Sequence, residues 1–231
     1  MVRRGEAHFA LEFYNDALDD FEEALLISTQ EDTTRAKILN NIGVVNYQCK
    51  NYDHALQYFV LALEIQRKWL DTSIRRQPII YDTSVTLGNI GKLYLQKNEY
   101  RLSYSAFEES CKLQTTAFPK DSNIVLGSLK SMGLVLAKNN QFSEALSIFR
   151  KILGLQEGRY GSESEPFIET LGTIGCLLAK ELEFEQSSKC LTKVLNWQKA
   201  NLPPTSSITR LTKATIDRVE DSADGNVSIW V

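Results

Sequence analysis

The stretch that decides the fold is residues 39–66, LNNIGVVNYQCKNYDHALQYFVLALEIQ. Its first half places Leu39, Ile42 and Gly43 on one face of a helix, because side chains three and four positions apart lie on the same side. The second half carries the other members of the pattern: Tyr52, Ala55, Phe59 and Ala62. Two helical faces joined at a corner predict an antiparallel helical hairpin.

The same pattern recurs along the chain, with an aromatic residue always nine positions after a glycine. The five glycine and aromatic pairs are Gly5 and Tyr14, Gly43 and Tyr52, Gly91 and Tyr100, Gly133 and Phe142, and Gly175 and Phe184. In a repeat protein each unit buries its apolar faces against its neighbours, so one repeat array replaces the usual count of domains. We therefore predict an all-α solenoid of about five antiparallel hairpins.

A known repeat family shows the same signatures. Residues 87–94 (LGNIGKLY) resemble the first-helix signature of a tetratricopeptide repeat (TPR), and residues 17–24 (ALDDFEEA) and 55–62 (ALQYFVLA) resemble its second-helix signature. The glycines are separated by 38, 48, 42 and 42 residues, against about 34 in the common repeat. A pitch of 42 is similar to the kinesin-light-chain and nephrocystin variety of the family. The resemblance implies a right-handed superhelix whose concave groove is lined by first helices.

The domain boundaries follow from the repeats. We expect the TPR-like array to span residues 1–202, with the first repeat truncated at its N-terminus because its first-helix pattern is incomplete. Pro203 and Pro204 end the last hairpin. Residues 203–231 are predicted to form a C-terminal capping helix and a flexible tail. Between the second and third repeats, the Leu70–Ile80 insertion accounts for the longer spacing and predicts an exposed loop.

Helix starts are marked by short polar residues that can accept hydrogen bonds from the free amides of a first turn. The predicted starts are Asp32-Thr33, Asp82-Thr83, Asp121-Ser122 and the segment from Ser162 to Ser164. A glutamine follows each of the last four motif glycines by 23 residues: Gln66, Gln114, Gln156 and Gln198. These glutamines either brace the loops between repeats or reflect only the shared ancestry of the repeats.

The bulk composition excludes several classes of partner. The formal net charge is −3 and the sequence pI is about 5.6, so no overall positive field attracts nucleic acid or anionic lipid. The apolar runs are too short for a membrane-spanning helix, and we expect no membrane insertion. The four cysteines have no metal-ligand spacing and indicate reduced thiols in an intracellular protein. We predict a cytoplasmic location, which is compatible with association with the cytoskeleton.

We expect no catalytic residue, no metal site and no cofactor, and therefore no enzyme. His8 and His54 have no candidate nucleophile or metal ligand at a suitable spacing. Gly154, Gly158 and Gly161 are not followed by the lysine of a phosphate-binding loop. They are typical of a helix end and a turn.

Polar side chains of the first helices are the candidate binding residues. The row two positions before the motif glycine consists of Asn41, Asn89, Ser131 and Thr173. Such small polar side chains can hydrogen bond to the main chain of an extended peptide without selecting its side chains. The other predicted groove residues are Asn40, Gln48, Lys92, Gln96, Lys130, Lys138 and Lys180. The lysines would favour acidic residues in the ligand, whereas the alternative is that all these polar groups only keep the array soluble.

The predicted function is a non-catalytic scaffold that binds a peptide segment of a partner protein in its concave groove. One alternative is a structural spacer or assembly subunit, with self-association end to end through the open ends of the array. A second alternative is an accessory repeat segment of a longer protein. Recognition of RNA is disfavoured because the polar rows lack stacking aromatic residues and concentrated arginine.

Overall fold

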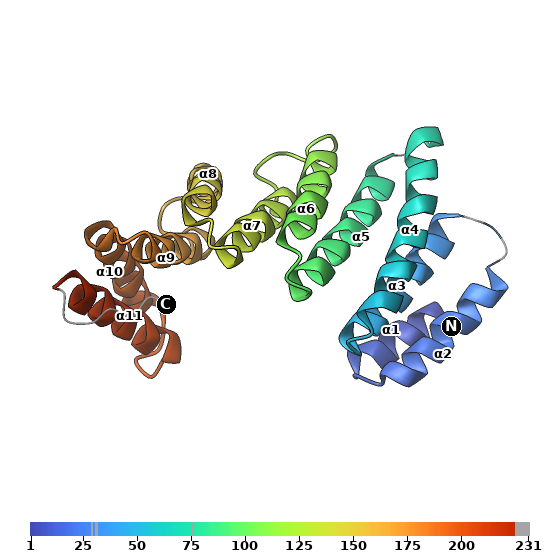
Figure 1. The fold of residues 1–231 in the computed structure, drawn as a ribbon, viewed down its shortest axis with the longest axis horizontal. Coiled ribbons are helices and arrows are strands. Elements are labelled where there is room, and N and C mark those ends of the chain that lie inside the picture. Colours follow the sequence, from blue (N-terminus) through green and yellow to red (C-terminus); the bar gives the residue numbers. More distant parts are fainter. Residues whose placement is uncertain (29, 31, 75, 225–231) are drawn as a thin grey trace. The chain divides into compact units, whose positions relative to one another are not determined.

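The computed structural model describes residues 1–28, 30, 32–74 and 76–224 (Figure 1). Within these residues the chain is built from α-helices that form consecutive antiparallel hairpins. The all-α, TPR-like fold predicted from the repeat is confirmed. The chain divides into two compact units, residues 1–119 and the residues from 120 onward, and each unit is described by itself. The predicted flexible tail falls largely on residues 225–231, which lie outside the described part.

The first unit contains three hairpins. Its helices are α1 (Val2–Ala10), α2 (Tyr14–Ile27), α3 (Thr33–Gln48), α4 (Tyr52–Thr72), α5 (Arg76–Gln96) and α6 (Tyr100–Gln114). Each second helix packs on the next first helix as well as on its own partner, so the apolar core is continuous from hairpin to hairpin. Phe21 and Phe59 are fully buried in this core.

The second unit contains two hairpins and one further helix. Its helices are α7 (Asn123–Lys138), α8 (Phe142–Tyr160), α9 (Glu165–Lys180), α10 (Phe184–Asn201) and α11 (Ser207–Ala223). The apolar face of α11 packs on α9 and α10, where Ile216 and Val219 are buried against Leu191 and Leu195. The hydrophobic effect therefore holds α11 on the last hairpin.

The motif glycines permit close packing of the two helices in each hairpin. A Cβ atom added at Gly43 would lie 2.6 Å from ring carbons of Phe59 and 3.2 Å from the carbonyl oxygen of Ala55. Gly91 has the same relation to Phe107, at 2.8 Å. Since carbon atoms in contact are normally about 3.5–4.0 Å apart, any larger residue would push the second helix away. The prediction that these glycines serve packing and not binding agrees with this geometry.

All five hairpin corners use the same backbone device. The residue seven positions after each motif glycine has a positive φ of 58° to 63°: Glu12, Lys50, Asn98, Asn140 and Leu182. The next residue donates its backbone N–H to a carbonyl five positions earlier, as in the 2.8 Å bond from Asn51 to Asn46. This left-handed helix end turns the chain back on itself. The fixed interval between glycine and aromatic residue therefore reflects a corner of constant length.

The Leu70–Ile80 insertion is mostly helical and not the loop that the sequence suggested, although most of its described middle residues are exposed as predicted. Most of it lengthens two helices, because α4 continues to Thr72 and α5 already begins at Arg76. Leu70, Ile79 and Ile80 are buried and pack with Leu113, Ala117 and Phe118. The loop prediction was wrong because the apolar residues at the two ends of the insertion, which a loop would leave in water, find a partner surface at the end of α6 and just after it.

Three of the four predicted helix starts coincide with a helix start, and one is wrong; Asp32 and Ser122 make capping hydrogen bonds, whereas Ser164 precedes α9 without one. The Asp32 carboxylate accepts from the backbone N–H groups of Thr34 and Arg35, both at 2.9 Å. Ser122 accepts from Val125 N at 3.5 Å. Asp82 lies inside α5 and caps nothing, because the insertion moved the start of this helix upstream.

The helix α11 has the register of another first helix. Aligned on the glutamine that recurs in the repeats, Ile216 and Val219 fall at the positions of Ile174 and Leu177. Asp217 stands where the motif glycine would be and is exposed. A carboxylate at that position prevents the close approach of a second helix.

Candidate functional site

The predicted asparagines meet on the surface formed by α3 and α5, which we call the α3–α5 face. The Asn89 side chain donates a 3.1 Å hydrogen bond from Nδ2 to Oδ1 of Asn40. Asn41, which the sequence aligned with Asn89, lies beside this pair and lines a cavity of about 250 Å³. All three side chains are half-buried, so they are fixed by their neighbours but remain accessible.

The α3–α5 cavity is framed by charged and apolar groups. An ion pair between Lys37 Nζ and Asp82 Oδ2, 3.2 Å long, joins α3 to α5. Glu6 of α1, Val85 of α5 and Gln66 of α4 also line the cavity. The groups in this cavity therefore offer hydrogen bonds and both signs of charge.

The remaining predicted residues of the first unit lie towards the ends of α3 and α5. Gln48, Lys92 and Gln96 are exposed. Burial raises the pKa of the Tyr47 hydroxyl, and a side-chain hydrogen bond with Gln96 partly opposes the increase. Gln96 is thus engaged with α3, while Lys92 points to solvent.

The predicted residues of the second unit are largely engaged with their own helices. Ser131 donates to Gly127 O at 3.0 Å, and Thr173 donates to Glu169 O at 3.1 Å. These bonds consume the hydroxyl hydrogens, so the two side chains can only accept hydrogen bonds from a ligand.

The three predicted groove lysines of the second unit have separate surroundings. Lys130 lies 3.5 Å from the carboxylate of Glu169. Lys138 and Lys180 stand in the last turns of α7 and α9, where a cation stabilises the helix dipole.

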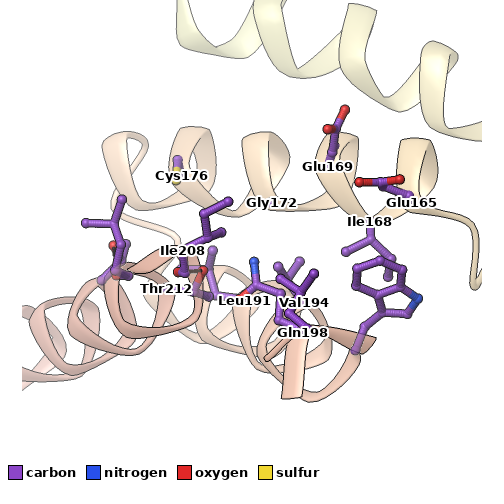
Figure 2. Close-up of a pocket in the computed structure, with 14 residues that line it drawn as sticks. Glu165, Ile168, Glu169, Gly172, Cys176, Leu191, Val194, Gln198, Ile208 and Thr212 are labelled. Atoms are coloured by element: carbon purple, nitrogen blue, oxygen red, sulfur yellow. Dashed lines mark hydrogen bonds between the residues drawn. The ribbon is translucent and has the colours of Figure 1, made fainter. Parts of the chain in front are cut away.

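A second cavity, in the last part of the chain, was not anticipated. It has a volume of about 360 Å³ and lies between α9, α10 and α11 (Figure 2). Its walls are mostly apolar, and Glu165 and Glu169 stand on its α9 side. We call it the α9–α11 cavity. Sequence reasoning missed it because α11 was treated as a cap and not as a helix in repeat register.

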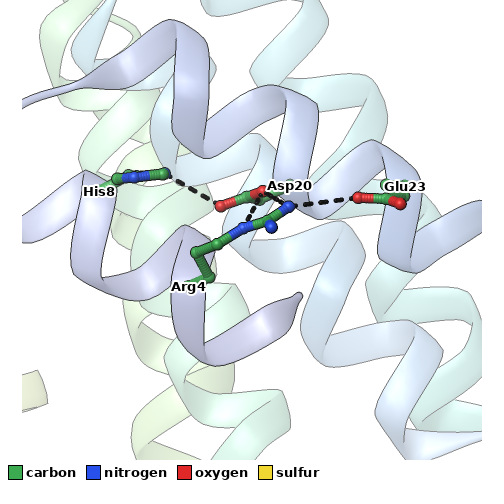
Figure 3. A network of polar contacts seen from close by, with 4 residues as sticks. All are labelled: Arg4, His8, Asp20 and Glu23. Carbon is green, nitrogen blue, oxygen red and sulfur yellow. Dashed lines mark hydrogen bonds and ion pairs between the residues drawn. The ribbon is translucent and has the colours of Figure 1, made fainter.

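A network of charged residues in the first hairpin was also missed (Figure 3). Arg4 donates to the Asp20 carboxylate at 2.6 Å and to Glu23 at 3.3 Å, and His8 Nδ1 lies 3.0 Å from Asp20. The hydrogen bond from the Arg4 guanidinium lowers the pKa of the Asp20 carboxyl below its ordinary value. Arg4 and His8 of α1 face Asp20 and Glu23 of α2, so the network joins the two helices of the first hairpin. Among the described residues, no group of three side chains is placed to hold a metal ion.

The hairpins, corners and helix contacts define a class of protein, the α-helical hairpin repeat. Residues 1–72 and residues 85–116 each match a family model described as tetratricopeptide repeat. These residues carry tetratricopeptide repeats, as the sequence predicted. No curated protein matches the sequence.

Solved structures of the same fold agree with this assignment. BtubC (BKLC) from P. vanneervenii has a TM-score of 0.71 at 11% identity, covering 96% of this chain and 85% of its own. A Podosopora anserina putative kinesin light chain with TPR-like repeats also has a TM-score of 0.71 at 11% identity, covering 85% and 92%. Aspartyl phosphate phosphatase F from Bacillus subtilis has a TM-score of 0.71 at 16% identity, covering 97% of this chain and 57% of its own. Similarity at this identity concerns the fold.

The fold has consequences for the class of function. Repeats of this family generally act as non-catalytic scaffolds, and the fold suggests a protein–protein interaction scaffold. No helix in the described ranges is long and apolar enough to cross a membrane.

Proposed function

We propose that the chain is an interaction scaffold that binds an extended peptide segment of a partner protein on the α3–α5 face. The observation that carries this proposal is the hydrogen bond from Asn89 to Asn40 beside the cavity that Asn41 lines. It fixes carboxamides of two helices in one place. A preorganised polar group loses little conformational entropy when a ligand binds.

The hydrogen-bonding capacity of these amides suits a peptide main chain. Each carboxamide has two N–H donors and an oxygen with two lone pairs, and the bond between Asn89 and Asn40 uses one donor and one lone pair. The remaining groups can pair with the alternating N–H and C=O groups of an extended strand. Val85, which is 39% exposed at the edge of the same cavity, can contact an apolar side chain of the ligand.

The charges around the cavity argue for limited charge selectivity. Lys37 is already paired with Asp82, and Glu6 adds a negative charge nearby. Lys92 is exposed on α5 and can pair with an acidic residue that lies beyond the cavity. We therefore expect main-chain recognition to supply most of the affinity.

The test selects short peptides from a random display library on the wild-type chain and measures their affinity for a double variant, Asn41→Ala with Asn89→Ala. Each lost hydrogen bond contributes about 0.5–1.5 kcal/mol, so the two changes together should weaken binding about tenfold. The matched control, Asn15→Ala with Asn196→Ala, removes exposed asparagines from α2 and α10 and should leave binding unchanged.

Two results would contradict the proposal. One is a set of selected peptides whose affinity is the same for both double variants. The other is the absence of any selected peptide, since a free main-chain binding face should retain members of a random library. Circular dichroism melts of both variants check that the fold is intact.

A further inference from the structure

The α9–α11 cavity occupies the same place in its repeat as the α3–α5 cavity. Glu169 and Lys37 both precede a motif glycine by six residues, and Gly172 and Asn40 both precede it by three. On the other side, Ile208 and Thr215 precede Asp217 by nine and two residues, as Asp82 and Asn89 precede Gly91. The two cavities are therefore equivalent positions with different side chains.

The side chains that connect the two first helices at the α3–α5 cavity have no counterparts at the α9–α11 cavity. In the first unit, the Lys37–Asp82 ion pair and the Asn40–Asn89 hydrogen bond connect the two first helices. In the second unit the corresponding pairs are Glu169 with Ile208 and Gly172 with Thr215, which can form neither connection. Gly172 has no side chain, and a Cβ atom there would meet Val194 at an ordinary 3.8 Å.

The apolar lining of the α9–α11 cavity is left in contact with water. Ile208 and Leu211 of α11 are 58% and 63% exposed, and Ile168 and Val194 form the opposite walls. Figure 2 shows side chains of α10 and α11 directed towards α9. Removal of apolar surface from water is favourable, so an apolar side chain that fills this volume would be stabilised there.

Two polar features restrict what can fill the cavity. The charged residues among its lining residues are Glu165 and Glu169, both acidic, and Lys130 approaches only Glu169, at 3.5 Å. Gln198 is 7% exposed, and its Oε1, like that of the other repeat glutamines Gln66, Gln114 and Gln156, has no hydrogen-bond partner among the described residues. An unpaired buried acceptor is costly, so a ligand that brings an N–H or O–H group would be favoured.

We propose that the α9–α11 cavity binds a partner segment in which a large apolar side chain lies next to lysine or arginine. The apolar side chain enters between Val194 and Leu211, a donor of the same segment pairs with Gln198, and the cation pairs with Glu165 at the entrance. Charge complementarity selects this occupant, because an acidic segment would be repelled by Glu165, whereas Glu169 is already paired with Lys130. The site belongs to the second unit and does not depend on the asparagines of the α3–α5 face.

The test uses three capped peptides with identical Gly-Ser flanks and the centres Lys-Trp-Lys, Glu-Trp-Glu and Lys-Ala-Lys. Binding to the full chain is followed by NMR, with the indole N–H signal of Trp197 as the local reporter, because this residue lines the cavity. The Lys-Trp-Lys peptide should shift this signal. Each of the other two should bind about tenfold more weakly, since one loses the charge pairs and the other the buried ring.

A matched pair of variants localises the binding. Gly172→Leu places a side chain in the cavity, while Gly88→Leu makes the same change at the equivalent position of α5, where a Cβ atom meets no other group within 4 Å. Leucine is a better helix former than glycine, so neither variant is expected to unfold. Gly172→Leu should reduce the affinity for Lys-Trp-Lys at least tenfold, and Gly88→Leu should not change it.

Several results would overturn this proposal. They are equal binding of all three peptides, preference for Glu-Trp-Glu, no binding at all, and equal effects of the two leucine variants. A fifth is sedimentation showing that the chain forms a dimer that Gly172→Leu dissociates, because the cavity would then be filled by a second copy.

Discussion

The close approach at Gly43 makes a sharp prediction about stability. In Gly43→Ala, the new methyl group would overlap the Phe59 ring, whose carbons lie 2.6 Å from the Cβ position, and would crowd the Ala55 carbonyl at 3.2 Å. Phe59 is 1% exposed and cannot move into solvent. Overpacking of this kind costs about 1–3 kcal/mol.

An opposing effect must be subtracted from that cost. Replacing a glycine inside a helix by alanine normally stabilises a protein by about 0.5–1 kcal/mol. The expected net result for Gly43→Ala is a loss of about 1 kcal/mol in the free energy of unfolding, near the middle of the range that these two effects allow. Gly88→Ala, which has open space around its Cβ position, should instead gain about 0.5–1 kcal/mol.

The assay is urea unfolding followed by circular dichroism for the wild type and both variants. Opposite signs for the two alanine variants support the packing argument. If Gly43→Ala is as stable as the wild type, or both variants shift in the same direction, the glycine is not required for the approach of the two helices and the reasoning is refuted.

Three other predictions concern the corners, the charged network and the insertion. Leu182→Gly should stabilise the chain by about 1 kcal/mol in urea unfolding, because Leu182 has a φ of 63° and is 66% exposed; an unchanged midpoint would contradict strain at this corner. The pKa of Asp20 is lowered in the folded protein, so the contribution of this carboxylate to the stability is present at neutral pH and is lost as the pH falls through the lowered pKa. The melting temperatures of Asp20→Asn and the wild type should therefore differ at pH 7 and converge in acid. A difference that stays constant with pH would count against the ion pair. Ile79→Ala should lower the free energy of unfolding by about 2–5 kcal/mol, because Ile79 is buried. The control Ile74→Ala, at a fully exposed position, should change this free energy by less than about 0.5 kcal/mol. Similar values for both variants would mean that Ile79 is not packed.

Much of the fold could be predicted because its signals are local. The interval from Gly43 to Tyr52 contains a helix end, one left-handed residue and a new helix start, and each depends on neighbours in sequence. Asp32 was correctly identified as a cap for the same reason. The insertion was misjudged because the partners of Ile79 and Ile80 lie more than thirty residues away at Leu113 and beyond, and no local rule contains that contact.

The candidate sites could likewise be predicted from the sequence only in part. The sequence placed Asn41 and Asn89 on first helices, but which asparagine pairs with Asn89 depended on the offset between α3 and α5, and the structure selects Asn40. The α9–α11 cavity depends on how α9, α10 and α11 pack together, which is visible only when all three helices are in place.

By itself the sequence determined the repeat, the hairpin, the positions of the glycines and corners, and the family, because these follow from the spacing of residues along one chain. Only the tertiary structure decided that the ends of the insertion are packed, that Asn89 bonds to Asn40, and that α11 leaves an apolar cavity beside α9. The physical reason is that packing and cavities arise between segments far apart in sequence, where small shifts of one helix along another change which side chains meet.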